Sequence, residues 1–328
     1  MTGSSGGEGA VTVRASWTQR HLLDVAGLSR AELALVLDVA AEMGSYRGHA
    51  DATAPLRGRT VATIFAEPST RTRVSFELAA RALGGEPVSL DAASSSLSKG
   101  ESLIDTVRTL EALGAAMLVV RHPRSGAPQL AAEHFGGSVV NAGDGWHAHP
   151  TQALLDLYTL RGQLGDGLVG AKVCIVGDVL HSRVARSNIW SLTAWGVDLW
   201  LTGPAVFLRG FDAWARALPA GRRLTVTGDL QAGLGDASAV MALRVQRERL
   251  EGAGAPSEAA YAARWGLTEE RLARLCPDAV VMHPGPVNEG VEIAPDVASG
   301  PRSLITRQVA NGVAVRMAVL ALLAKAAS

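Results

Sequence analysis

The chain has 328 residues, of which 48% are hydrophobic and 19% charged. This balance excludes a disordered chain, and the length favours two domains of roughly 150 residues each. Lys and Arg together number 31, as do Asp and Glu, so no overall positive charge exists to attract nucleic acid or a membrane surface. Any site for an anion must therefore be built locally.

The cysteine content and the chain start suggest where the protein resides. Only Cys174 and Cys276 occur, each beside apolar residues, so we expect reduced, buried thiols and a cytoplasmic location. Residues 1–13 are rich in Gly and Ser and lack the features of a secretory signal, which predicts a flexible tail. The most apolar stretch, residues 313–324, is short and carries Arg316, so no membrane span is expected.

The first half of the chain alternates helical and β-type patterns. Ser29 and Glu32 form a capping-box pattern, which predicts a helix that ends near residue 43. Further helices are predicted at residues 74–83 and 103–113. Strands are predicted at residues 60–65, 88–90, 117–120 and 138–141. Strands that alternate with helices indicate a parallel sheet.

A second series of the same kind follows a predicted helix at residues 151–164, near which we place the domain boundary. Its strands are expected at residues 173–176, 197–202, 224–226, 239–243 and 279–283. A last apolar helix, from about residue 304, could dock on either domain. The predicted fold class is α/β, with two domains that are each a parallel sheet flanked by helices, and a C-terminal helix. The expected segments are the tail at 1–13, domains at 14–150 and 151–303, and the helix at 304–328.

The segment Ser69-Thr70-Arg71-Thr72-Arg73 lies where a strand gives way to a helix. A helix start offers unpaired N–H groups and the positive end of the helix dipole, and this one adds three hydroxyls and two guanidinium groups. An ordinary helix cap needs only one hydroxyl. The segment therefore predicts an anion site, with phosphate as its natural ligand.

Two further polar segments follow predicted strands. Arg121-His122-Pro123 lies at the carboxyl end of a strand, where open α/β sheets bind ligands. His149-Pro150-Thr151-Gln152 precedes the helix between the domains, where a crevice is expected. A single histidine is more often structural than functional, so each segment alone is a weak indication.

Taken together, these motifs make the chain resemble the aspartate and ornithine carbamoyltransferase family, over nearly its whole length after the tail. The resemblance rests on the three segments above and on four more. These are Asn141-Ala142-Gly143-Asp144-Gly145, Val176-Gly177-Asp178, Arg244-Val245-Gln246 and His283-Pro284-Gly285-Pro286. It implies transfer of a carbamoyl group from carbamoyl phosphate to an amino acid. We expect direct transfer without a covalent enzyme intermediate or a cofactor. No metal is expected either, because His147 and His149 lie two residues apart with no third ligand close in sequence.

By this resemblance, the first domain would bind carbamoyl phosphate. Ser69, Thr70, Arg71 and Thr72 would hold its phosphate, Arg121 and His149 would reach its carbonyl oxygen, and Gln152 its amino group. Pro284 and Gly285 would complete this subsite. The resemblance marks five residues as catalytic: Arg71, Thr72, Lys99, Arg121 and His149. Donors that face a developing oxyanion stabilise the transition state more than the ground state.

The second substrate separates the branches of the family, and the sequence resembles the aspartate branch, which serves pyrimidine biosynthesis. There Arg244 and Gln246 would bind the side-chain carboxylate of aspartate, Arg183 its α-carboxylate, and Pro286 would line the subsite. Lys99 would reach the site from an adjacent subunit, which implies a homotrimer with shared active sites. The pocket and the His-Cys-Leu-Pro segment typical of ornithine enzymes are missing, although ornithine or another acceptor stays an alternative.

Several points stay open in the sequence. The loop residue that accompanies Lys99 is either Ser95 or Ser96, and Glu289 stands where bacterial relatives often carry arginine. Regulatory chains or another enzyme of the pathway could join the trimer. A dinucleotide-dependent enzyme is a second reading, but Val176-Gly177-Asp178 has one glycine where that fingerprint needs three. A non-catalytic relative is a third reading, which the complete set of site residues disfavours.

Overall fold

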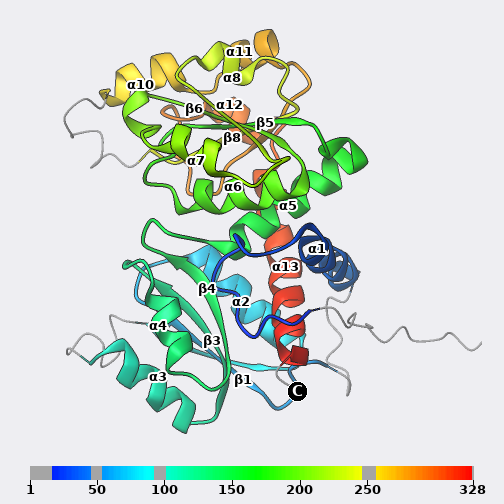
Figure 1. The fold of residues 1–328 in the computed structure, drawn as a ribbon, viewed down its shortest axis with the longest axis vertical. Coiled ribbons are helices and arrows are strands. Elements are labelled where there is room, and N and C mark those ends of the chain that lie inside the picture. Colours follow the sequence, from blue (N-terminus) through cyan, green and yellow to red (C-terminus); the bar gives the residue numbers. More distant parts are fainter. Residues whose placement is uncertain (1–16, 46–53, 92–100, 246–255, 327–328) are drawn as a thin grey trace, which may run out of the picture.

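The computed structural model describes residues 17–45, 54–91, 101–245 and 256–326. They form two lobes, each built on a parallel β-sheet with helices on both faces (Figure 1). This is the predicted fold class. Both sheets are rich in buried Val, Ile, Leu and Ala, as expected for parallel strands covered on two sides.

The first lobe has a sheet with the strand order β2-β1-β3-β4. Its elements are α1 (Arg30–Ser45), β1 (Thr60–Phe65), α2 (Thr70–Ala82), β2 (Glu86–Asp91), α3 (Leu103–Ala112), β3 (Ala115–His122), α4 (Ala127–Glu133), β4 (Ser138–Asp144) and α5 (Pro150–Leu164). Every predicted strand of this half is present within a few residues. The helix predicted from residue 74 begins earlier, at Thr70, so the Ser-Thr-Arg segment forms the first turn of α2.

The second lobe has a sheet with the order β7-β6-β5-β8-β9. Its elements are β5 (Lys172–Val176), α6 (Arg183–Trp195), β6 (Asp198–Thr202), α7 (Phe211–Ala217), β7 (Arg223–Thr227), α8 (Leu230–Leu234), β8 (Ala239–Ala242), α10 (Glu258–Trp265), α11 (Glu269–Leu275), β9 (Val280–Met282) and α12 (Pro295–Ser299). Short 3-10 turns occur at Gly165–Leu168 and Ala205–Phe207. Cys174 and Cys276 are both buried and unpaired.

The C-terminal helix α13 (Ile305–Ala326) packs on the first lobe, a choice that the sequence left open. It contacts α1, α2 and α5, and it runs beside α1 in Figure 1. Among the described helices, α13 alone is long and apolar enough to span a membrane, but 67% of that stretch is buried inside the protein. Its apolar character thus serves the core, since Val315, Val319 and Leu322 are fully buried.

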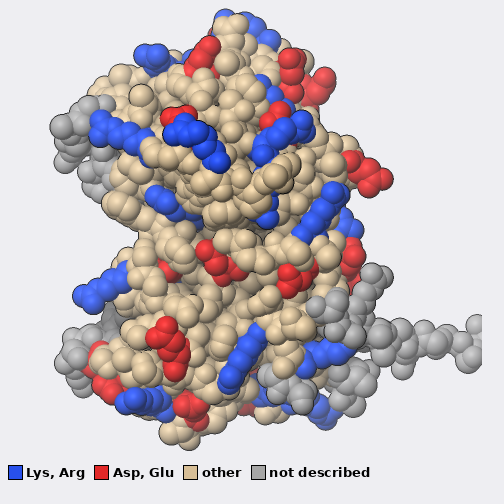
Figure 2. Space-filling model, viewed as in Figure 1, with Lys and Arg blue, Asp and Glu red and all other residues tan. Residues whose placement is uncertain are grey.

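Each sheet has a point where the strand order reverses, between β1 and β3 in the first and between β5 and β8 in the second. Chain connections leave such a point in opposite directions, which opens a crevice at the carboxyl ends of the strands. The face shown in Figure 2 mixes positive and negative side chains and has a waist between the lobes. The fold thus indicates a ligand site in the space between the lobes.

Candidate active site

A cavity of about 710 Å³ opens between the lobes, and both sheets supply its walls. From the first lobe come residues that follow β1, β3 and β4, and from the second come residues that follow β5, β8 and β9. Five arginines line it, compared with two carboxylates, Glu67 and Asp178. The arginines are Arg71, Arg121, Arg183, Arg244 and Arg316. The cavity is therefore built for anions.

Three helix starts border this cavity, those of α2, α5 and α6. The residues that precede α2 and α5 are Ser69 and His149, and neither side chain makes a cap hydrogen bond. Ser182 does cap α6, because its side chain accepts a hydrogen bond from the Ala185 N–H at 3.1 Å. Helix starts attract anions through unpaired N–H groups and the helix dipole. Because the Ser69 hydroxyl makes no cap hydrogen bond, the start of α2 keeps both this hydroxyl and its backbone N–H groups for an anion.

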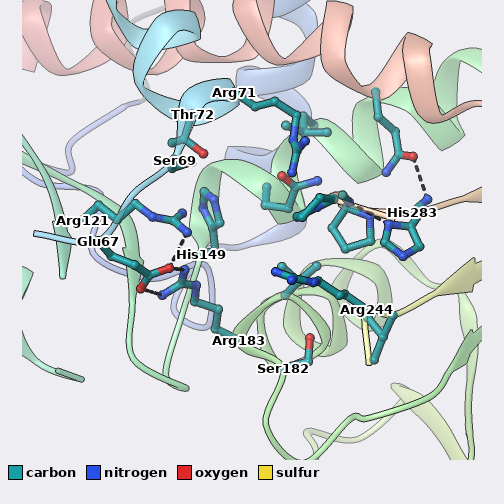
Figure 3. Close-up of a pocket in the computed structure, with 18 of the residues that line it drawn as sticks. Glu67, Ser69, Arg71, Thr72, Arg121, His149, Ser182, Arg183, Arg244 and His283 are labelled. Atoms are coloured by element: carbon teal, nitrogen blue, oxygen red, sulfur yellow. Dashed lines mark hydrogen bonds and ion pairs between the residues drawn. The ribbon is translucent and has the colours of Figure 1, made fainter. Parts of the chain in front are cut away.

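Arg71 and Arg244 enter the cavity from opposite lobes (Figure 3). Burial lowers the pKa of Arg71, and the positive charge of Arg244 lowers it further. The Arg71 guanidinium also lies directly against Gly285, which has a φ of +65°. A Cβ atom at position 285 would stand 2.9 Å from Arg71 Cζ, so only glycine lets the backbone approach this closely.

Glu67 joins Arg121 and Arg183, and the sequence analysis did not assign Glu67 to the site. Its Oε1 accepts hydrogen bonds from Arg121 Nη2 at 2.6 Å and from Arg183 Nη2 at 2.5 Å, while Oε2 accepts from Arg183 Nη1 at 3.0 Å (Figure 3). Burial alone would raise the pKa of Glu67, but the hydrogen bonds and charges of Arg183 and Arg121 outweigh it and lower that pKa. A glutamate two residues before the Ser-Thr-Arg segment was the available signal.

The pKa of Arg121 reflects its burial among other positive charges. Burial, and next the charge of Arg183, lower the pKa of Arg121 to about 10. Gly143, with a φ of +118°, makes room, because a Cβ there would stand 3.1 Å from both Arg121 Nη1 and Arg183 Nε. Arg121 therefore stays charged at neutral pH, so an incoming anion meets a preformed positive group.

His149 is buried beside these arginines and holds no charge at neutral pH. Burial first, and then the charges of Arg121, Arg183 and Arg316, lower its pKa well below the ordinary value. Its Nδ1 has no hydrogen-bond partner within the described part of the chain. A neutral imidazole can donate one hydrogen bond to a ligand, but it cannot supply a proton as an imidazolium.

The structure brings together every predicted site residue that it describes. Twelve of them line the one cavity: Ser69, Thr70, Arg71, Thr72, Arg121, His149, Gln152, Arg183, Arg244, Pro284, Gly285 and Pro286. Lys99 and Gln246, with the loop serines Ser95 and Ser96 and the tail, lie outside the described residues. Glu289 is exposed, and its backbone pairs with Ile293. No cluster of three or more metal-binding side chains occurs among the described residues.

Comparisons with known proteins agree with this geometry. Residues 20–162 match the family "Aspartate/ornithine carbamoyltransferase, carbamoyl-P binding domain", and residues 169–323 match "Aspartate/ornithine carbamoyltransferase, Asp/Orn binding domain". The aspartate carbamoyltransferase catalytic subunit of a Roseiflexus species is 53% identical over 303 residues, which cover 92% of this chain and 94% of that protein.

Two solved structures resemble the fold closely. Aspartate transcarbamoylase from Trypanosoma cruzi, in complex with N-(phosphonacetyl)-L-aspartic acid, has a TM-score of 0.81 and 29% identity, and covers 95% of this chain and 98% of that chain. Ornithine carbamoyltransferase from Pyrococcus furiosus has a TM-score of 0.84 and 27% identity, and covers 94% and 98%. Backbone similarity alone therefore does not separate the two kinds of enzyme.

Glu67→Gln removes the negative charge between Arg121 and Arg183 while it keeps the side-chain volume. Because folding lowers the pKa of Glu67, its contribution to stability is present above an unfolded-state pKa near 4.5 and is lost as the pH falls through the folded-state pKa. We expect the variant to unfold with about 2 kcal/mol less free energy at pH 7, and with a smaller deficit at pH 4. Urea titrations at both pH values measure this. The exposed-site change Glu270→Gln is the control, and an equal deficit at both pH values would contradict the account.

Gly285→Ala tests the contact between the backbone and Arg71. The added methyl group displaces the guanidinium, so we expect affinity for inorganic phosphate, measured by calorimetry, to fall about tenfold or more. Gly58→Ala is the matched control, because Gly58 has a similar φ of +69° but nothing within 4 Å of the added Cβ. Both variants should lose about 1–2 kcal/mol of stability from the left-handed backbone, and only Gly285→Ala should lose affinity. Equal affinity in the two variants would rule out the contact.

Proposed function

The chain belongs to the aspartate/ornithine carbamoyltransferase family, and we propose that it transfers the carbamoyl group of carbamoyl phosphate to the α-amino group of L-aspartate. The products are N-carbamoyl-L-aspartate and phosphate. One observation carries this conclusion: arginines from both lobes and three helix starts meet in one cavity. Two anionic substrates require such an arrangement, because each must be held beside the other against their mutual repulsion.

The donor would occupy the side of the cavity formed by the first lobe. Its phosphate fits the start of α2, with Ser69, Thr70, Arg71 and Thr72 as donors, and Gly285 keeps Arg71 in place. Arg121 and His149 would face the carbonyl oxygen and Gln152 the amino group, with Pro284 beside them. The support is their shared cavity, together with the Ser69 hydroxyl, which makes no cap hydrogen bond, and the neutral state of His149.

The acceptor would occupy the side formed by the second lobe. Arg183 would bind the α-carboxylate of aspartate, and Arg244 with Gln246 the side-chain carboxylate, with Pro286 at the rim. The planar fork of arginine suits a carboxylate. Glu67 already shows a carboxylate on Arg183 in this geometry. The choice of aspartate over ornithine is supported by Arg244-Val245-Gln246 and His283-Pro284-Gly285-Pro286, and by relatives 50–53% identical over 92% of this chain, which are named aspartate carbamoyltransferase catalytic subunits.

The reaction itself needs no covalent intermediate. The neutral amine of aspartate attacks the carbamoyl carbon, its electron pair forms the new C–N bond, and the carbonyl oxygen becomes negative. The C–O bond to phosphate then breaks as the carbonyl reforms, and the departing phosphate takes the proton of the amine. Arg121 stabilises the oxyanion by charge, and neutral His149 by a hydrogen bond. Removal of one such donor slows reactions by roughly a hundredfold to a thousandfold.

We infer further that the active protein is a homotrimer in which Lys99 completes a neighbour's site, in the cytoplasm and without cofactor or metal. The trimer rests on the family resemblance of the loop that carries Lys99. The location rests on two buried, unpaired cysteines.

Arg244→Lys tests the acceptor subsite. A lysine keeps the charge but loses the two-pronged hydrogen bond, so we expect the KM for aspartate to rise roughly tenfold to a hundredfold, while the KM for carbamoyl phosphate changes less than threefold. Steady-state assays with aspartate and with ornithine measure this, and the exposed Arg209→Lys is the control. Turnover of the unmodified protein with ornithine in place of aspartate would overturn the proposed acceptor.

Mixed trimers test the shared site. Lys99→Ala and Arg71→Ala chains should each be nearly inactive alone, because each site then lacks one essential cation. After subunit exchange, some hybrid sites combine an intact Lys99 with an intact Arg71, so part of the activity should return. Native mass spectrometry verifies the exchange. Verified hybrids without recovered activity would contradict the shared site, whereas the single variants would still test the donor subsite.

A further inference from the structure

Asp156 lies in α5, one helical turn after Gln152, and is completely buried. Its carboxylate accepts hydrogen bonds from three amide side chains that lie on three helices. Oδ1 accepts from Gln152 Nε2 at 2.9 Å and from Gln308 Nε2 at 2.7 Å, and Oδ2 accepts from Asn188 Nδ2 at 2.8 Å. A buried carboxylate that accepts three hydrogen bonds indicates a specific structural or functional role. The transfer mechanism above assigns no role to Asp156.

An ionised carboxylate can only accept hydrogen bonds, so it decides which way each amide faces. The Gln152 nitrogen must point to Asp156, which leaves Gln152 Oε1 as the atom available to a ligand. Within the described residues no protein donor reaches Gln152 Oε1, and Gln152 lines the cavity. The amide orientation that the cavity presents is therefore fixed by Asp156.

Asp156 also fixes the orientation of the other two amides, those of Gln308 and Asn188, which lie in neighbouring parts of the site. Gln308 donates its nitrogen to Asp156, and its Oε1 accepts from the backbone N–H of His283 at 3.0 Å, next to Pro284 and Gly285. Asn188 lies in α6, the helix that begins at Arg183. Asp156 thus connects the donor side of the cavity with segments of the second lobe that line it.

Asp156 keeps its negative charge at neutral pH despite its burial. Burial raises its pKa, and the three amide hydrogen bonds and the charge of Arg316 oppose that rise, so the pKa is about 6. Arg316 of α13 is the charged group that acts on Asp156 from the helices packed around it in the described structure. At pH 7.5 the acceptor-only form dominates, and the amide directions above apply.

We propose that Asp156 is a positioning residue for the carbamoyl donor: it holds the Gln152 amide so that Gln152 Oε1 accepts a hydrogen bond from the carbamoyl NH2 group. The inference rests on the proposed function and deepens it, since it assigns the origin of donor specificity. Acetyl phosphate carries a methyl group where carbamoyl phosphate carries NH2. The methyl group would leave Gln152 Oε1 without a donor, which disfavours acetyl phosphate roughly fivefold to a hundredfold.

The experiment compares the affinities for carbamoyl phosphate, acetyl phosphate and inorganic phosphate by competition at pH 7.5, in unmodified protein and three variants. Asp156→Ala removes the acceptor, and preference for carbamoyl over acetyl phosphate should fall to that of Gln152→Ala. The double variant Asp156→Ala/Gln152→Ala should lose no more than Gln152→Ala alone, since the two residues act through one hydrogen bond. Affinity for inorganic phosphate, which lacks the acyl group, should change less than threefold throughout.

Asp156→Asn is the conservative variant. It keeps one acceptor oxygen, which can face Gln152 and Gln308, while Asn188 turns its amide to meet the new NH2 group. Asn188 Oδ1 has no hydrogen-bond partner within the described residues, so this turn gives up only the 3.2 Å hydrogen bond from Asn188 Nδ2 to the Val184 carbonyl and its 3.9 Å contact with Met241 Sδ. Preference for carbamoyl phosphate should therefore stay within about threefold of the unmodified protein. Should Asp156→Ala fail to fold by circular dichroism, Asp156→Ser replaces it, because water can fill the space beside its hydroxyl.

The possible outcomes distinguish a failure of the Asp156 proposal from a failure of the proposed function. If Asp156→Ala keeps the full preference, or if the double variant loses clearly more than Gln152→Ala, then Asp156 does not act through Gln152. A purely structural role would lower all three affinities together and would contradict the proposal as well. If the unmodified protein binds neither acyl phosphate, the proposed function fails instead.

Discussion

Repulsion among arginines is the constraint on which the site depends. Arg71, Arg121, Arg183 and Arg244 share one cavity, and the lowered pKa values of Arg71 and Arg121 record both their burial and their proximity to other arginines. Like charges this close are tolerated only where fixed anions or bound ligands offset them. Glu67 offsets part of the charge of Arg121 from the first lobe and of Arg183 from the second. The remaining positive charge is what two anionic substrates would neutralise, so the side chains of the cavity already supply the field that the reaction needs.

The fold holds these charges in place through its topology and through a few small residues. Both sheets direct the carboxyl ends of their strands, at the points where strand order reverses, toward the same space. Gly143 and Gly285 let backbone and guanidinium groups approach more closely than a side chain would allow. Asp156 accepts hydrogen bonds from the side-chain amides of Gln152, Asn188 and Gln308, of which Gln152 and Gln308 line the cavity. Preorganisation here comes from rigid elements rather than from the ligand.

Much of this could be predicted from the sequence, because the signals are local. Alternating β-type and helical patterns gave the strands, and Ser69 to Thr72 indicated an anion site at a helix start. The position of α13 could not be predicted, since its apolar face fits either lobe and only packing against α1, α2 and α5 selects one. The bridge from Glu67 to Arg183 and the contacts of Asp156 with Gln308 join residues more than a hundred positions apart. No local pattern encodes such pairs.

The central claim is that one cavity holds a phosphate group and the two carboxylates of aspartate side by side. Calorimetric titration with N-(phosphonacetyl)-L-aspartate, compared with the same phosphonacetyl group attached to ornithine, tests this most directly. The account predicts that the aspartate compound binds at least a hundredfold more tightly, because the ornithine compound lacks the side-chain carboxylate and places an ammonium group near Arg244 instead, and that its affinity falls with added salt. Equal affinities, or tighter binding of the ornithine compound, would contradict the account.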